Sequence, residues 1–75
     1  MPLINVKLIE SVLTPAQKQD VIRKLTDAMV SIEGENTRQA TVVILEEAKS
    51  GDWGIAGNPI TTNDVKALIA GKMKL

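Results

Sequence analysis

Two strand-like segments flank one long helical segment, and this pattern restricts the fold of the chain more than any other feature. Residues 3–9 (LINVKLI) alternate apolar and polar side chains, as half-covered strands do. Thr14, Pro15 and Gln17 supply a helix N-cap, a proline at the first helical position and a capping-box glutamine. The apolar run at 40–45 predicts a second strand, covered on both faces by helices or other subunits. A strand–helix–strand connection of this kind is right-handed, so we expect parallel strands in an α/β (α+β) fold.

The remaining elements are predicted from turn and cap residues. Apolar residues recur at helical spacing as far as Gly34, where the long helix should end; they are Val21, Ile22, Leu25, Ala28, Met29 and Ile32. A turn is expected at 34–38. Residues 49–59 are rich in glycine and predict a loop or short hairpin. Thr61 or Thr62 should then cap a short last helix that ends at Gly71.

Composition limits both the size of the core and the possible partners. Seventy-five residues form a single small domain, residues 1–75. The chain has no Cys and no His, which removes disulfides and the usual zinc ligands. A domain this small is then expected to bury apolar surface against copies of itself.

Nine basic residues balance nine acidic ones and Trp53 is the only aromatic residue, which argues against nucleic-acid binding. No apolar run of membrane-spanning length and no signal peptide are seen, so we expect a cytoplasmic protein without a membrane partner.

The side-chain inventory leaves few groups for acid–base chemistry. Without His, Cys or Tyr, the α-amino terminus is the group that titrates near neutral pH when unperturbed, at about 7.7–8.0. A proline in second position normally follows a methionine that is trimmed, so Pro2 would become a free secondary amine. Near Leu3, Ile9 and Trp53, desolvation would lower the pKa of that amine and favour its neutral form. The simpler alternative is that Pro2 only begins a strand, where no ladder hydrogen bond is lost.

Three segments of the sequence carry a resemblance to a known family. Pro2 precedes the strand LINVKLIE, PAQKQDVIRKLTDAM follows as a helix, and VVILEEAKSGDWGIAG joins EEAK to an aromatic-Gly-Ile-x-Gly segment. Together they resemble the 4-oxalocrotonate tautomerase family nearly end to end. The resemblance implies β-α-β subunits with a short C-terminal hairpin or helix, assembled as a homohexamer or a related trimer or dimer. It also implies an amino-terminal proline as catalytic base, with no cofactor and no metal.

The resemblance also suggests which residues form the site. Pro2 matches the catalytic proline, Trp53 matches an aromatic pocket wall, and two apolar lining positions hold Ile9 and Ile55. Simpler roles stay open for two of them: Pro2 as a strand start and Trp53 as a packing residue at a subunit interface.

The family's two carboxylate-binding arginines are missing from this chain. Their places hold Val12 and Thr41, and Arg38 lies near enough to Thr41 to substitute. Arg38 could equally form a surface or intersubunit ion pair. Because bidentate arginine pairing is what orients a dicarboxylate, we expect a small substrate with one carboxylate.

The leading functional expectation is therefore a cofactor-free isomerase that moves a proton in a small enol or keto acid. One rival is water addition to, or dehalogenation of, an unsaturated acid, with Asp52 activating water; an Asp after Gly is more often a turn residue. Another is a non-catalytic oligomer that binds small acids. Glu46 and Glu47, beside Lys49, are expected to form surface or interface pairs.

Overall fold

The computed structural model describes residues 1–74, and its strands and α-helices follow the order that the sequence predicts. They are β1 (Leu3–Ile9), α1 (Pro15–Glu33), the 3-10 helix η1 (Glu35–Ala40), β2 (Val42–Ala48), β3 (Trp53–Ile55), β4 (Asn58–Ile60) and α2 (Thr62–Ile69). The chain divides into two compact units, each described by itself below. Unit 1 comprises residues 1–6 and 13–46, and unit 2 comprises residues 7–12 and 47 onward.

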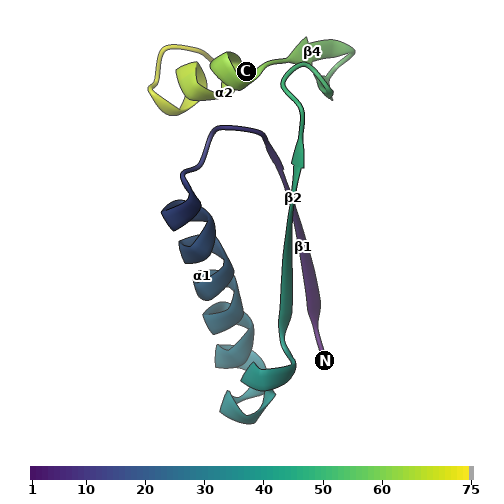
Figure 1. The fold of residues 1–75 in the computed structure, drawn as a ribbon, viewed down its shortest axis with the longest axis vertical. Coiled ribbons are helices and arrows are strands. Elements are labelled where there is room, and N and C mark those ends of the chain that lie inside the picture. The colour runs from purple at the N-terminus through teal and green to yellow at the C-terminus, as the bar shows by residue number, and fades with distance from the viewer. Residues whose placement is uncertain (75) are drawn as a thin grey trace. The chain divides into compact units, whose positions relative to one another are not determined.

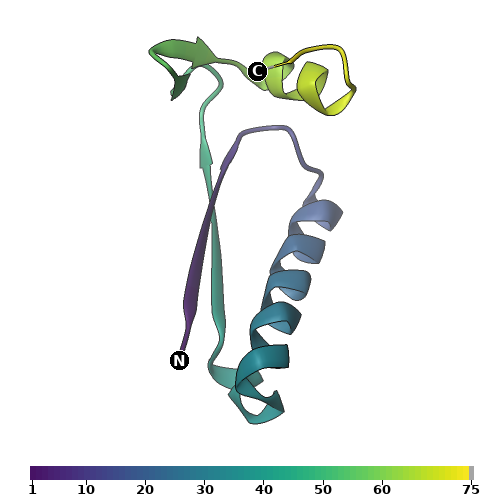
Figure 2. The ribbon, with the colours of Figure 1, turned by 180° about the vertical axis from the view of Figure 1, so that it is seen from behind.

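Unit 1 contains α1 and most of β1 and β2, which form the β-α-β arrangement that the sequence predicts, and the last residues of both strands belong to unit 2. β1 and β2 are hydrogen-bonded neighbours in a two-stranded parallel sheet. The N–H of Val42 donates to the carbonyl oxygen of Pro2 at 3.0 Å, which fixes the register where both strands begin. α1 lies along one side of the two strands in both views (Figures 1 and 2). Exposure alternates along both strands, as expected when one face is covered.

Both ends of α1 are determined by local signals. The hydroxyl of Thr14 accepts from the N–H of Gln17 at 3.1 Å, and the Gln17 side chain accepts from the N–H of Thr14 at 2.9 Å. This reciprocal pair is the predicted capping box. The helix ends at Glu33, and Gly34 follows with a φ of 105°, a conformation that favours glycine. Both predicted ends are confirmed.

The covered face of α1 agrees with the predicted stripe in part, because Val21, Leu25 and Met29 are half-buried. Val30, which the predicted stripe omits, is the buried side chain, whereas Ile32 is 82% exposed and Ile22 39% exposed. Helical spacing alone allows more than one choice of face, and packing in unit 1 selects the face that carries Val30.

The second strand begins two residues later than predicted. Residues 35–40, expected as part of a turn and the start of the strand, form η1 instead, so β2 runs from Val42 to Ala48. Within one subunit only one face of this strand is covered, because Val42 and Ile44 are 41% and 38% exposed, and coverage of the second face by another subunit stays a prediction. With Leu3, which is 61% exposed, they give the uncovered side of the strands an apolar character.

Unit 2 contains the predicted hairpin and last helix. β3 and β4 are antiparallel, with Trp53 opposite Ile60. Ala56 and Gly57 form the turn with φ values of 51° and 82°, as a two-residue hairpin loop of the I′ kind requires. Thr61 rather than Thr62 caps α2, which ends at Ile69 instead of Gly71. Of the helices within residues 1–74, none combines the length and apolar character needed to cross a membrane.

Candidate functional site

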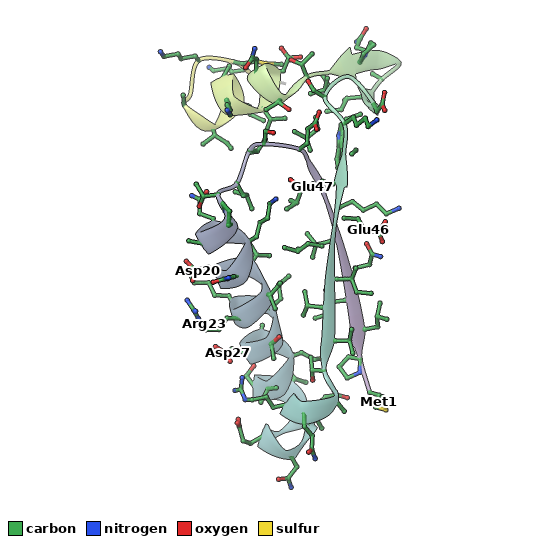
Figure 3. The ribbon with its side chains drawn as sticks, viewed as in Figure 1. Met1, Asp20, Arg23, Asp27, Glu46 and Glu47 are labelled. Atoms are coloured by element: carbon green, nitrogen blue, oxygen red, sulfur yellow. The ribbon has the colours of Figure 1, made fainter. Side chains whose placement is uncertain are left out.

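Pro2 occupies the position from which β1 starts. It is half-buried, and its carbonyl oxygen accepts the 3.0 Å hydrogen bond from Val42. On its other side the ring nitrogen is bonded to Met1, which is 94% exposed and extends past the start of the strand (Figure 3). The sheet therefore holds Pro2 through its carbonyl group, while the residue attached to its nitrogen is exposed to solvent.

Thr41 immediately precedes the residue that pairs with Pro2. It is half-buried; its N–H donates to the carbonyl oxygen of Arg38 at 3.2 Å, and its hydroxyl donates to that of Thr37 at 2.9 Å. With its proton directed to the Thr37 carbonyl, the oxygen of Thr41 keeps lone pairs that can accept a hydrogen bond from a ligand. Thr41 and Arg38 thus lie in unit 1 at the same end of the sheet as Pro2.

The guanidinium group of Arg38 is held by two carboxylates of its own subunit. Nη1 donates to Asp27 at 2.7 Å, while Nε and Nη2 donate to the two oxygens of Glu35 at 2.7 and 3.2 Å. These bonds raise the pKa of Arg38, and the Arg38 hydrogen bond is the main reason that the pKa of Glu35 is lowered. Two negative charges face one positive charge, so this cluster is not an empty carboxylate site. It borders an open hollow lined by Glu35, Asn36, Arg38 and Gln39.

The three apolar site residues lie in unit 2. Ile9 ends β1 and is only 5% exposed. Trp53 begins β3 and is half-buried, and Ile55 ends the same strand with 38% exposure. Because residues two apart on a strand share a face, Trp53 and Ile55 lie on one side of the hairpin. Unit 1 therefore places Thr41 next to the residue that pairs with Pro2, whereas the guanidinium group of Arg38 is bonded to Asp27 on α1. The apolar candidates lie within unit 2.

The remaining charged candidates have local structural roles. Asp52 is exposed, and its N–H donates to the carbonyl oxygen of Lys49 at 2.8 Å, as in a turn. Glu46 accepts a hydrogen bond from Asn5 at 2.6 Å on the side of the strands away from α1 (Figure 3). Within the subunit, the partner of the Glu46 carboxylate is thus the side-chain amide of Asn5 and not the cation of an ion pair.

Two sets of interactions were missed by reasoning from sequence. The Glu35–Arg38 pair has a spacing of three residues that could have indicated it, but the contact with Asp27 depends on packing. The second set joins Glu10 to Ser50 and Thr62, which are 40 and 52 positions away in the sequence. No sequence pattern predicts these contacts.

Metal binding finds no support in the described part of the chain, residues 1–74. No group of three or more acidic side chains is arranged there to hold a metal ion, and the sequence contains no His or Cys.

Comparison with known proteins agrees with this architecture. The family model described as tautomerase enzyme matches residues 2–63. The "Probable tautomerase K2" of Dickeya dadantii is 34% identical over 61 residues, covering 81% of this chain and 90% of the relative. A "Probable tautomerase" of Staphylococcus aureus is 40% identical over 57 residues, covering 76% and 90%. The crystal structure of YwhB, a homologue of 4-oxalocrotonate tautomerase, superposes with a TM-score of 0.69 at 28% identity, covering 84% of this chain and 97% of that one. The chain therefore belongs to the tautomerase family, among the homologues of 4-oxalocrotonate tautomerase.

Proposed function

We propose that this protein is a cofactor-independent tautomerase in which Pro2, freed by removal of Met1, is the general base. Membership of the tautomerase family supports a function of this type. The observation that carries the proposal is the placement of Pro2: its carbonyl group is fixed by Val42, and its nitrogen leads to the exposed Met1. Loss of Met1 would expose a secondary amine without removing a residue of either strand.

The proposed reaction moves one proton and needs no other reactant. The neutral ring nitrogen accepts the proton of an enol hydroxyl, so the O–H bond breaks and an N–H bond forms. The electron pair shifts through the conjugated system to a carbon atom, which then takes the proton back from the ammonium group. A positioned general base of this kind contributes roughly 10²–10⁴-fold to the rate.

Charge in unit 1 favours a substrate with a single carboxylate. Arg38 is already bonded to Asp27 and Glu35, and Thr41 offers no positive charge. A carboxylate that binds Arg38 must displace one of these two acidic partners. A dicarboxylate would need a second cation as well, so we propose a small enol or keto acid with one carboxylate and an otherwise apolar body.

We further propose that Trp53 and Ile55 form the apolar wall of the pocket, with Ile9 packed beneath the surface. The exposures support this division, because Trp53 and Ile55 are partly exposed while Ile9 is nearly inaccessible. An apolar wall excludes water, which strengthens electrostatic interactions at the reacting atoms. The hydration alternative gains no support, because Asp52 is an exposed turn residue.

The test combines Pro2→Ala with a pH–rate profile on a panel of enol acids bearing one or two carboxylates. Pro2→Ala should keep the circular dichroism spectrum of the wild type and lose about 100-fold or more in ketonisation rate. The wild-type rate should rise with pH as the amine loses its proton. Wild-type turnover by Pro2→Ala would sink the proposal, and a rate that falls with pH would favour water addition by a protonated proline instead. Binding without turnover would favour a small-acid-binding protein.

A further inference from the structure

We infer that Glu10, Ser50 and Thr62 form a hairpin clamp that positions the β3–β4 hairpin, and that Glu10 and Thr62 are therefore positioning residues for the Trp53 wall. This inference rests on the proposed role of Trp53 as a pocket wall, because Trp53 is part of the hairpin. Glu10 follows β1, Ser50 precedes β3 and Thr62 follows β4, so the three residues meet at the base of the hairpin.

The clamp consists of three hydrogen bonds that form a closed set. The N–H of Ser50 donates to the Glu10 carboxylate (Oε2) at 2.7 Å. The hydroxyl of Thr62 donates to the carbonyl oxygen of Glu10 at 2.7 Å. The N–H of Thr62 donates to Oγ of Ser50 at 2.9 Å. Glu10 thus holds the chain on both sides of the hairpin, through its side chain on one side and its backbone on the other.

Within unit 2, Glu10 is itself bonded to the last residue of β2. Its N–H donates to the carbonyl oxygen of Ala48 at 2.8 Å, directly after the last residue of β1. The N–H of Gly51 donates to the carbonyl oxygen of Ile60 at 3.0 Å and continues the hairpin ladder toward the clamp. Within unit 2, Glu10 therefore links the hairpin to the last residue of β2.

The hairpin needs such support because its strands have only three residues each. An isolated two-stranded hairpin is marginally stable at best in water. The clamp also begins α2, since Thr62 is its first residue and its otherwise unpaired N–H is satisfied by Ser50. α2 continues to Ile69, beyond the segment that the family model matches. We assign to α2 the role of supporting the wall from the C-terminal side.

The sequence provides a direct reporter for this inference. Trp53 is the only aromatic residue of the chain, so tryptophan emission and its quenching by acrylamide report the hairpin alone. Thr62→Val removes the hydroxyl donor and keeps the branched shape, whereas Thr62→Ser keeps the donor. Thr26→Val is the matched control, because the Thr26 hydroxyl donates to the carbonyl oxygen of Ile22 within α1, outside unit 2.

Thr62→Val should raise acrylamide quenching of Trp53 and speed hydrogen exchange of the hairpin amides about fivefold, the effect of one ordinary hydrogen bond. Thr62→Ser and Thr26→Val should match the wild type in both measurements. For an enol acid with an apolar body, Thr62→Val should raise KM while kcat changes little, as loss of binding surface does.

Unchanged quenching and exchange in a folded Thr62→Val protein would overturn the inference. So would a fall in kcat at constant KM, or failure of Thr62→Ser to restore the wild-type values. If Thr62→Val does not fold, Ser50→Ala is used instead, because it removes the acceptor of the Thr62 N–H. Ser50→Ala must then raise acrylamide quenching of Trp53 above the wild-type value. The fluorescence and exchange arms do not involve turnover, so they test the clamp even if Pro2 proves not to be the base.

Discussion

Arg38 contacts one carboxylate from α1 and one from its own 3-10 helix, Asp27 and Glu35. All three side chains are substantially exposed, so the Coulomb energy of each pair is reduced by solvent. The geometry nevertheless matters, because three nitrogen atoms of the guanidinium group already have acceptors. A substrate carboxylate competes with these acceptors for the same donors.

Removing one competitor should therefore improve substrate binding. We expect Asp27→Asn to lower KM for a monocarboxylate enol acid by up to roughly fivefold, the scale of an exposed ion pair. Asp20→Asn is the matched control, because Asp20 pairs with Arg23 and not with Arg38. Like Asp27, Asp20 lies on the side of α1 that is turned away from the strands (Figure 3). Steady-state kinetics decides the matter, and equal KM values for the two variants would rule out Arg38 as a substrate ligand.

The Glu35–Arg38 pair also gives a pH-dependent prediction. Hydrogen bonding to Arg38 lowers the pKa of Glu35 from its ordinary 4.5. A lowered folded-state pKa contributes stability that is present above the ordinary value and lost as pH falls through the folded value. Arg38→Gln should return the pKa of Glu35 toward 4.5, measured by NMR of the side-chain carboxyl carbon. An unchanged titration in Arg38→Gln would refute this cause.

At the scale of elements, the ends of α1 show what local sequence can determine. Thr14, Pro15 and Gln17 act within one turn of chain, and the capping box that they predict is present. Gly34 ends the helix for an equally local reason. The covered face is different: Val30 is buried and Ile32 is exposed because of what packs against the helix, which spacing along the chain does not contain.

The capping box gives a stability prediction at this scale. Thr14→Ala removes the acceptor for the Gln17 N–H, so we expect it to lower the free energy of unfolding by about 1 kcal/mol. Thr14→Ser keeps the acceptor and should be close to the wild type. Urea denaturation measures both, and equal midpoints for Ala and Ser would contradict a stabilising role for the cap.

For the candidate site, too, the residues marked by nearby sequence could be predicted, whereas contacts between distant residues could not. The position of Pro2 at the head of a strand, and of Trp53 on a hairpin, could be predicted from sequence and family resemblance. The pairing of Arg38 with Asp27 and the hairpin clamp could not, because these contacts join residues 11, 40 and 52 positions apart. Their partners are chosen by the folded backbone and not by a repeat in the sequence.

On the scale of the whole molecule, the core of one subunit is small. Within residues 1–74, the buried hydrophobic side chains are Ile9, Val30 and Ile60. By contrast, Leu3, Val42 and Ile44 are 38–61% exposed. A domain of this size without disulfides or metal commonly gains stability by association, so we propose that these three residues contact another copy of the chain.

Sedimentation of charged variants tests this assembly. The wild type should sediment as a species several times heavier than the 8.1 kDa chain, and Ile44→Asp should dissociate it, because a charge would be buried unpaired. Ile32→Asp makes the same change at an 82% exposed position of α1 and should leave assembly intact. A monomeric wild type, or assembly unaffected by Ile44→Asp, would contradict the proposed interface.

Two forms of one chain show whether the nitrogen of Pro2 is the base. One form has lost Met1, verified by intact mass; the other keeps a residue ahead of Pro2, so that the same nitrogen is an amide. All other side chains are identical, and ketonisation of one enol acid is measured for both. We predict activity in the first form and a rate at least about 100-fold lower in the second. Equal rates would show that Pro2 is not the base.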